Sequence, residues 1–290
     1  RFGQLIVFAF QQLLAILAAT IAVPSIIGYG MSQSAALFGA GVGTLVYLAF
    51  TKFRSPVFLG SSFAFIGSML AAFAGAVTLG NTDIGFAGLI IGAFFAGLVY
   101  VIIALIVKKS GVKWIDRLMP PVVIGPTVAI IGLSLAGNAI GNSFGFGSPQ
   151  SGYSMDLSSG VNLICALVTL FTVIACSVKG KKMMKLIPFI IGILAGYVCA
   201  LIFTLIGNAT NNDSLKIISF QAFSNMQWVP DFTFLTAFKG FGELSGTYIA
   251  TLAVAYVPVA FVVFAEHIAD HKNLSSIIGK DLLEDPGLHR

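Results

Sequence analysis

Long stretches of apolar residues, separated by short polar segments, form the dominant pattern of this chain. Residues 2–51 carry no charged side chain, and residues 84–107 and 157–178 form uncharged runs of 24 and 22 residues. A helix needs roughly 20 apolar residues to cross the hydrocarbon core of a bilayer. The pattern therefore predicts an all-α polytopic membrane protein.

Eight stretches have the length and hydropathy expected of membrane spans. We expect these spans at residues 5–28, 34–51, 56–76, 84–107, 118–140, 158–178, 186–206 and 247–271. The glycine-containing segment Gly28–Ser32 separates the first two spans. The longest polar stretch, at about residues 207–246, is rich in Asn and Ser, and we expect it to be an extracellular loop.

The positive charges are sorted between the two sides of the predicted membrane. With the N-terminus in the cytoplasm, 14 of the 16 Lys and Arg residues fall in cytoplasmic segments, and only Lys216 and Lys239 fall in outer loops. Cytoplasmic loops of membrane proteins are enriched in Lys and Arg. The sorting predicts a cytoplasmic N-terminus, and it explains the net charge of +5 without a nucleic-acid partner.

Composition supports the membrane class. Hydrophobic residues make up 57% of the chain, and the mean hydropathy is +0.97. A soluble domain of this size cannot bury that much apolar surface. The three cysteines, Cys165, Cys176 and Cys199, lie in apolar runs without metal-ligand spacing, so we expect small buried residues and no metal. We expect no cleavable signal peptide, because the first apolar run is long enough to span.

The third predicted span has an unusual sequence. After Pro56, residues 57–59 favour an extended conformation, and Gly60-Ser61-Ser62-Phe63 is small and polar where a span should be apolar. Non-helical backbone is tolerated in a membrane where it is buried in protein or lines a cavity. Broken spans of this kind form substrate sites in transporters. Close helix packing is an alternative explanation for the small residues.

Four ionisable residues lie near the end of the last apolar run, in VVFAEHIADHKN (262–273). Glu266 and Asp270 are spaced i, i+4, as are His267 and His271, so each pair shares one helix face. Ionisable groups inside a membrane are expensive and usually mark ion or substrate pathways. A carboxylate that is held away from water also takes up a proton more readily, so it can exchange protons near neutral pH.

Two other interpretations of this stretch remain open at the sequence level. The uncharged run before Glu266 has 22 residues, so Glu266 could stand at the cytoplasmic surface as an ordinary helix end. His267, Asp270 and His271 are also loosely similar to a His-x-x-Glu-His zinc pattern. That pattern needs further ligands, and the sequence offers none at a suitable spacing.

Several segments resemble the nucleobase–ascorbate transporter (nucleobase:cation symporter) family, and within it the uracil permeases. The resemblance covers essentially the whole chain. The segments that carry it are FQQLLAILAATIAVP (10–24), FLGSSFAFIGSML (58–70), MPPVVIGPTVAIIGLSLAG (119–137, a looser match) and PVAFVVFAEHIADHKNLSSIIGKDLLEDPGLHR (258–290). The terminal DLLEDPGLHR is the most specific part.

The resemblance implies a fold of fourteen spans in two inverted repeats of seven, with a short strand in the third span. On this template the chain covers roughly the first eight spans, and we expect it to be a fragment of a longer protein. The implied divisions are a core (substrate) domain at 1–107, a gate domain at 108–206, an extracellular loop at 207–246, and the eighth span with a cytoplasmic loop at 247–290.

The resemblance also implies roles for individual residues. Glu266 matches the carboxylate that hydrogen-bonds the nucleobase, and Phe63 matches a residue that meets the base through its backbone and ring. Gly60, Ser61 and Ser62 would shape that approach, with Ser62 and Gly60 counted in the binding site.

Two positions depart from the family pattern. Gln11 and Gln12 stand where members commonly have Gln-His. Asp270, followed by His271, stands where uracil carriers have His. Glu266, Asp270 and His271 are therefore the proton-coupling candidates, and Asp270 could equally be a solvated helix end.

The function expected from the resemblance is proton-coupled uptake of uracil across the bacterial cytoplasmic membrane by alternating access. We expect no enzymatic activity, no metal, and no cofactor other than the coupling proton. The expected partners are the nucleobase, membrane lipid and, as an open option, a second copy of the chain in a homodimer. The alternatives are a carrier for xanthine or another nucleobase, an anion carrier, an intramembrane metalloenzyme, or a fragment that is inactive alone.

Overall fold

The structure is a computed structural model of the 290-residue chain. It describes residues 2–118, 120–145, 155–181, 183–186, 188–219, 229 and 231–290. Throughout these residues the regular structure is helical, and no β-strand is formed. The predicted all-α class is confirmed for the described part of the chain.

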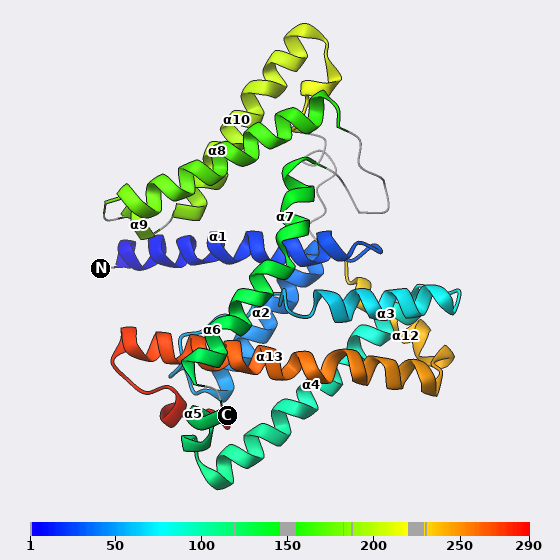
Figure 1. Cartoon of the computed structure of the whole chain (residues 1–290), viewed down its shortest axis with the longest axis vertical. Helices are drawn as coiled ribbons and strands as arrows, with labels where there is room; N and C mark the ends of the chain where they lie inside the picture. Colours follow the sequence, from blue (N-terminus) through cyan, green and yellow to red (C-terminus); the bar gives the residue numbers. More distant parts are fainter. Residues whose placement is uncertain are drawn as a thin grey trace. The chain divides into compact units, whose positions relative to one another are not determined.

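Six long helices provide most of the structure (Figure 1). They are α1 (Phe2–Ile27), α2 (Gln33–Phe50), α4 (Asp83–Ser110), α8 (Leu157–Lys179), α10 (Pro188–Thr210) and α13 (Gly246–Ile278). Five helices of the described residues, α2, α4, α8, α10 and α13, are long and apolar enough to cross a membrane. The chain is therefore an integral membrane protein, with helices at six of the eight predicted spans.

The two remaining predicted spans are interrupted. The third contains only the 13-residue helix α3 (Ile66–Thr78), and the fifth is divided at Leu135 between α6 (Pro121–Ser134) and α7 (Ala136–Ser143). The other short elements connect the long helices. They are α5 (Lys113–Leu118), α9 (Met183–Leu186), α12 (Ala237–Gly240), the 3₁₀ turns Asp213–Leu215, Thr233–Thr236 and Phe241–Glu243, and a π turn at Leu283–Gly287.

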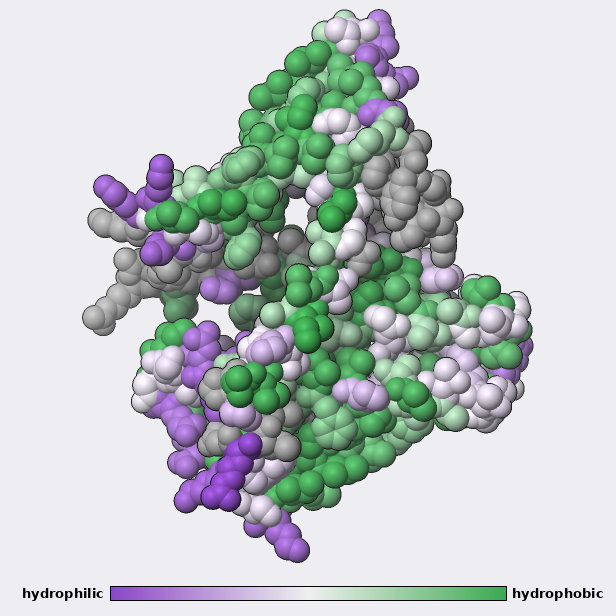
Figure 2. All heavy atoms as spheres, in the orientation of Figure 1, coloured by the Kyte–Doolittle hydropathy of each residue, from purple (hydrophilic) through white to green (hydrophobic). Residues whose placement is uncertain are grey.

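The chain divides into two compact units. Unit 1 comprises residues 1–19 and 135–229, and unit 2 comprises residues 20–134 and 230–290. The functional division into core and gate domains stays a prediction. In unit 1, α8 packs against α10 where Gly192 and Gly196 face Val173 and Thr169. Figure 2 shows apolar side chains covering this helix pair and hydrophilic residues at its ends, which is the surface expected of lipid-facing helices.

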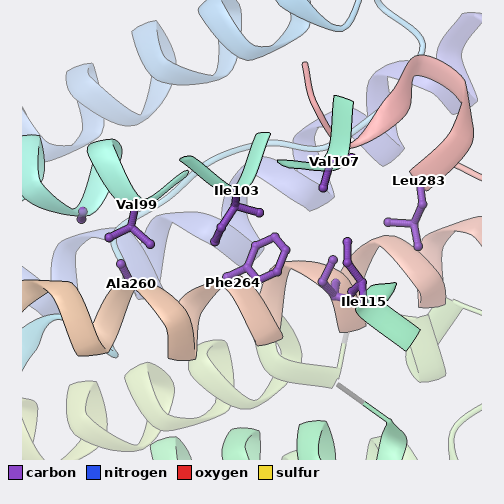
Figure 3. Packing of buried hydrophobic residues seen from close by; sticks show 9 residues of the cluster. Val99, Ile103, Val107, Ile115, Ala260, Phe264 and Leu283 are labelled. Carbon is purple, nitrogen blue, oxygen red and sulfur yellow. The ribbon is translucent and has the colours of Figure 1, made fainter. Parts of the chain in front are cut away.

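Unit 2 is built on α4 and α13, which pack side by side. Their shared core contains Val99, Ile103 and Val107 from α4 and Ala260, Phe264 and Ile268 from α13, with Ile115 and Leu283 closing one end (Figure 3). A second cluster joins α3 to the first half of α13 through Ala72, Ala76, Tyr248, Leu252 and Tyr256. These two clusters hold α3, α4 and α13 together, and the candidate site is built on these three helices.

Glycines on α4 create the space for the aromatic residues of this frame. A Cβ added at Gly88 would overlap the Tyr248 hydroxyl, and one added at Gly92 would overlap the Tyr256 ring. The Tyr248 hydroxyl donates to the carbonyl of Ala72 at 2.8 Å, and Ser68 Oγ donates to the carbonyl of Ala255 at 2.8 Å. Because these glycines lack side chains, the aromatic rings can lie directly against the α4 backbone.

Candidate functional site

The third span is broken, as the sequence predicts. Residues 56–62 are neither helix nor strand, and α3 begins only at Ile66. The predicted short strand is wrong for this structure. A strand needs a hydrogen-bonded partner, and the described residues supply no second strand beside this segment.

Hydrogen bonds to neighbouring helices hold the broken segment in place. The Leu59 backbone N–H donates to Thr44 Oγ1 on α2 at 2.9 Å. Ser61 Oγ donates to the carbonyl of Thr20 on α1 at 3.0 Å. The broken segment is therefore held against both helices.

A cavity of about 320 Å³ lies beside this segment. Ser61 and Ser62 contribute to its wall, together with Phe65 and Met69 at the start of α3. Its other lining residues are Val23, Pro24, Met31, Ala36, Leu89, Ala93, Ala96 and Tyr256. The wall is mostly apolar with a few polar groups, and the volume falls within the range of small-molecule sites.

Glu266 lies on α13 and is half-buried. Its carboxylate interacts electrostatically with Tyr100 and with Asp270, and it accepts no hydrogen bond from the described residues. The helix continues to Ile278, so Glu266 is not at a helix end. Tyr100 stands one turn along α4 from Ala96, which lines the cavity.

The structure brings together only part of the predicted site. Ser61 and Ser62 line the cavity, whereas Glu266, Phe63 and Gly60 do not. Phe63 lies in the turn before α3, where its carbonyl accepts the Ile66 N–H at 3.2 Å, and Gly60 is exposed.

The supporting glutamines are not placed at the cavity by the described residues. Gln12 is exposed on α1, and the side chain of Gln11 lies outside the described part.

The two remaining proton-coupling candidates differ sharply in their surroundings. Asp270 is exposed. His271 is only 7% exposed, and its ring stacks on that of His267 with centroids 4.2 Å apart. His271 Nε2 lies 3.0 Å from the Tyr47 hydroxyl on α2. Across the described residues, no group of three or more His, Cys, Asp and Glu side chains is arranged to hold a metal ion.

Sequence reasoning missed several polar groups of this region. Tyr47 forms part-buried contacts with Ser55 and His271, and the hydroxyls of Thr20 and Tyr256 are buried without a partner among the described residues. Each is a hydroxyl in or beside an apolar run. That signal is weak, because tyrosine and threonine are common in membrane helices and only packing shows which hydroxyls are enclosed.

Comparisons with known proteins place the chain among permeases. A family model described as "Permease family" matches residues 3–290. The chain is 39% identical over 288 residues to the uracil permease of Bacillus caldolyticus, covering 99% of this chain and 59% of that protein. It is 37% identical over 283 residues to the uracil permease of Bacillus subtilis (strain 168), covering 98% and 59%. It is 33% identical over 288 residues to the uracil permease of Escherichia coli (strain K12), covering 99% and 58%. The chain thus spans 58–59% of the length of these relatives.

Proposed function

The chain belongs to the permease family, and we propose that it forms part of a membrane transporter that takes up uracil together with protons. The matched relatives are named uracil permeases. We further propose the fold of two inverted seven-span repeats, of which this chain supplies roughly the first eight spans. The order of helices supports this proposal, because eight apolar segments are present and the third is broken.

The observation that carries the proposal is the cavity at the broken span. The third apolar segment has a non-helical stretch at residues 56–62, and the end of that stretch lines a cavity of small-molecule size. Irregular backbone in a membrane protein is tolerated where it lines a cavity. Transporters place substrate sites at such interrupted spans.

The chemistry of uracil suits the groups around this cavity. Uracil presents alternating N–H donors and C=O acceptors on a small neutral ring. The Ser62 hydroxyl can donate or accept, the Ser61 hydroxyl can accept while it donates to Thr20, and an ionised Glu266 can only accept. In a site shielded from water, an unmatched partner costs roughly 1–3 kcal/mol, which discriminates against the wrong base.

Glu266 must come closer to the cavity if Glu266 and the cavity serines are to contact the same uracil ring. In this structure Glu266 stands outside the cavity wall. We propose that alternating access includes this approach, so that protonation of the carboxylate and binding of uracil favour the same conformational change. Asp270 lies on the same face of α13 as Glu266, one turn later, and His271 is the next residue. We propose that these two residues complete the proton site.

Uptake by the full-length protein tests this function. Glu266→Gln removes the charge and keeps the size of the side chain, and Glu284→Gln is the matched control because Glu284 is exposed. We expect Glu266→Gln to weaken uracil binding roughly 10-fold or more, as befits a lost hydrogen bond to a charged group, and to abolish pH-driven accumulation. Labelled uracil uptake at several external pH values measures both effects.

The same assay can refute the proposal. Wild-type accumulation by Glu266→Gln would exclude the carboxylate from coupling. Competition by excess sulfate or bicarbonate, with none by uracil, would show an anion carrier instead.

A further inference from the structure

A partly buried polar cluster joins three segments of unit 2 away from the cavity. It consists of Tyr47 near the end of α2, Ser55 in the loop that precedes the broken span, and His271 on α13. The Tyr47 hydroxyl donates to Ser55 Oγ at 2.8 Å and lies 3.0 Å from His271 Nε2. Ser55 is 0% exposed and His271 is 7% exposed. In such surroundings a polar group that loses its hydrogen-bond partner is costly.

Contacts within α13 and beyond it fix the orientation of the His271 ring. His271 Nδ1 lies 3.1 Å from the carbonyl of His267. A carbonyl can only accept, so Nδ1 carries the proton of that bond, and Nε2 is the nitrogen that faces Tyr47. In the neutral ring Nε2 is an acceptor, so the single hydrogen of the Tyr47 hydroxyl is shared between Nε2 and Ser55 Oγ, and Ser55 can donate its own hydroxyl hydrogen to Tyr47. Ser275 Oγ donates to the His271 carbonyl at 2.6 Å and accepts from the Leu282 N–H at 3.0 Å. The ring therefore offers Tyr47 a fixed partner.

The cluster lies at the start of the broken span, whereas the hydrogen bonds of Leu59 and Ser61 hold the later part of the segment against α2 and α1. None of the residues of α2, all of which are described, is buried. The ion pair Arg54–Asp285, at 2.7 Å, is nearby in sequence, but its side chains are 57% and 67% exposed. Exposed ion pairs contribute little to stability. The part-buried hydrogen bonds of Tyr47 thus carry more of the attachment between this loop and α13.

The position of the cluster along the chain connects it to the candidate site. His271 follows Glu266 by five residues on α13, and Ser55 precedes Pro56, where the broken segment starts. A shift of Ser55 relative to His271 would displace the segment that ends at Ser61 and Ser62.

We propose that Tyr47 and Ser55 are positioning residues for the substrate. Through His271 they hold the start of the broken span against α13 and so set the distance between Glu266 and the serines of the cavity. This inference rests on the proposed function. Neither residue touches the substrate in this arrangement, so loss of either hydroxyl acts through the position of residues 56–62.

Two variants of the full-length protein test the positioning role. Tyr47→Phe removes the hydroxyl and keeps the ring, and Ser55→Ala removes its acceptor. Tyr197→Phe is the matched control, because Tyr197 is 64% exposed on α10. Hydrogen–deuterium exchange without substrate reports on residues 51–62, and labelled uracil uptake gives KM and maximal rate separately.

The expected pattern distinguishes positioning from a general loss of folding. We expect both variants to raise exchange in residues 51–62 and to raise KM for uracil roughly five- to tenfold, with the maximal rate per folded molecule retained. The control should match the wild type in both measurements. Loss of folded protein alone would lower the maximal rate and leave KM unchanged.

Each other result overturns the inference. Unchanged exchange in residues 51–62 would show that the cluster does not hold the segment, whatever the transport data. Raised exchange with an unchanged KM would show that the cluster supports the fold and not the site. If the wild type takes up no uracil, the proposed function fails, and the exchange measurement still decides whether Tyr47 and Ser55 hold the broken span.

Discussion

Glycine positions on α4 decide how closely this helix approaches α13. Gly92 is buried, and a Cβ added there would overlap the Tyr256 ring. Tyr256 is itself 3% exposed and stacks on Phe65, with ring centroids 5.6 Å apart. Phe65 and Tyr256 both line the cavity. The missing side chain at Gly92 therefore shapes one wall of the candidate site.

Substitution of Gly92 by Ala should destabilise the protein. An extra methyl group in a packed contact costs about 1–3 kcal/mol, because the Tyr256 ring must shift. Gly97→Ala on the same helix is the matched control, since nothing lies within 4 Å of an added Cβ there. We expect that control to be neutral or slightly stabilising, because Ala favours helix over Gly.

Thermal unfolding of the purified protein in detergent compares the two variants. Equal unfolding temperatures for Gly92→Ala and Gly97→Ala would show that the Tyr256 ring moves without cost.

At the scale of elements, the ends of the long helices are defined by their capping residues. Ser32, Asp156 and Ser245 each accept a backbone N–H from the first turn of α2, α8 and α13. Among the helices without such a cap, which include α4 and α7, is α3, whose N-cap residue Phe65 provides no side-chain hydrogen bond. Its first N–H groups are left for other partners. This uncapped start coincides with the broken segment and the cavity.

The cap at Asp156 gives α8 a dependence on pH. Hydrogen bonds from the Ser158 hydroxyl and from the Ser159 backbone N–H and hydroxyl hold the pKa of Asp156 below its usual range. A carboxyl whose pKa is lowered by folding stabilises the folded state above its unfolded pKa of about 3.9. That stabilisation is lost as the pH falls through the lower folded value.

Asp156→Ala should therefore lower the unfolding temperature at pH 7 and have a much smaller effect near pH 3. Asp156→Asn is the control, because Asn caps helices as well as Asp and carries no titratable group. Thermal melts at both pH values check this expectation. An alanine variant that loses the same amount at both pH values would contradict the role of the ionised cap.

At the scale of the whole molecule, the sorting of cations predicts the orientation in the membrane. The last turns of α4 and α8 contain Lys108, Lys109 and Lys179. Lys216 follows α10 and pairs with Asp213 at 2.7 Å. Under the positive-inside rule, the first group faces the cytoplasm and Lys216 faces outward.

Labelling of single cysteines checks this orientation. In the full-length protein with its native cysteines replaced by alanine, Lys216→Cys should react with a membrane-impermeant maleimide added to intact cells. Lys181→Cys should react only after the membrane is made permeable. The reverse pattern would show that the N-terminus is outside.

The sequence by itself determined the class of protein, the positions of the spans and the break in the third span. These features follow from hydropathy, from the length a helix needs in a bilayer, and from Pro56 and the small residues Gly60–Ser62, all of which are local properties. It also pointed to Ser61 and Ser62, because polar residues in a broken span are unusual.

Only the tertiary structure decided which polar groups are enclosed and which of them meet. Tyr47, Ser55 and His271 are separated by up to 224 residues, and no local pattern connects them. The same reason explains why Glu266 could be singled out by its charge but not placed relative to the cavity. Burial and distance depend on how α2, α4 and α13 pack, and packing is a property of residues far apart in the chain.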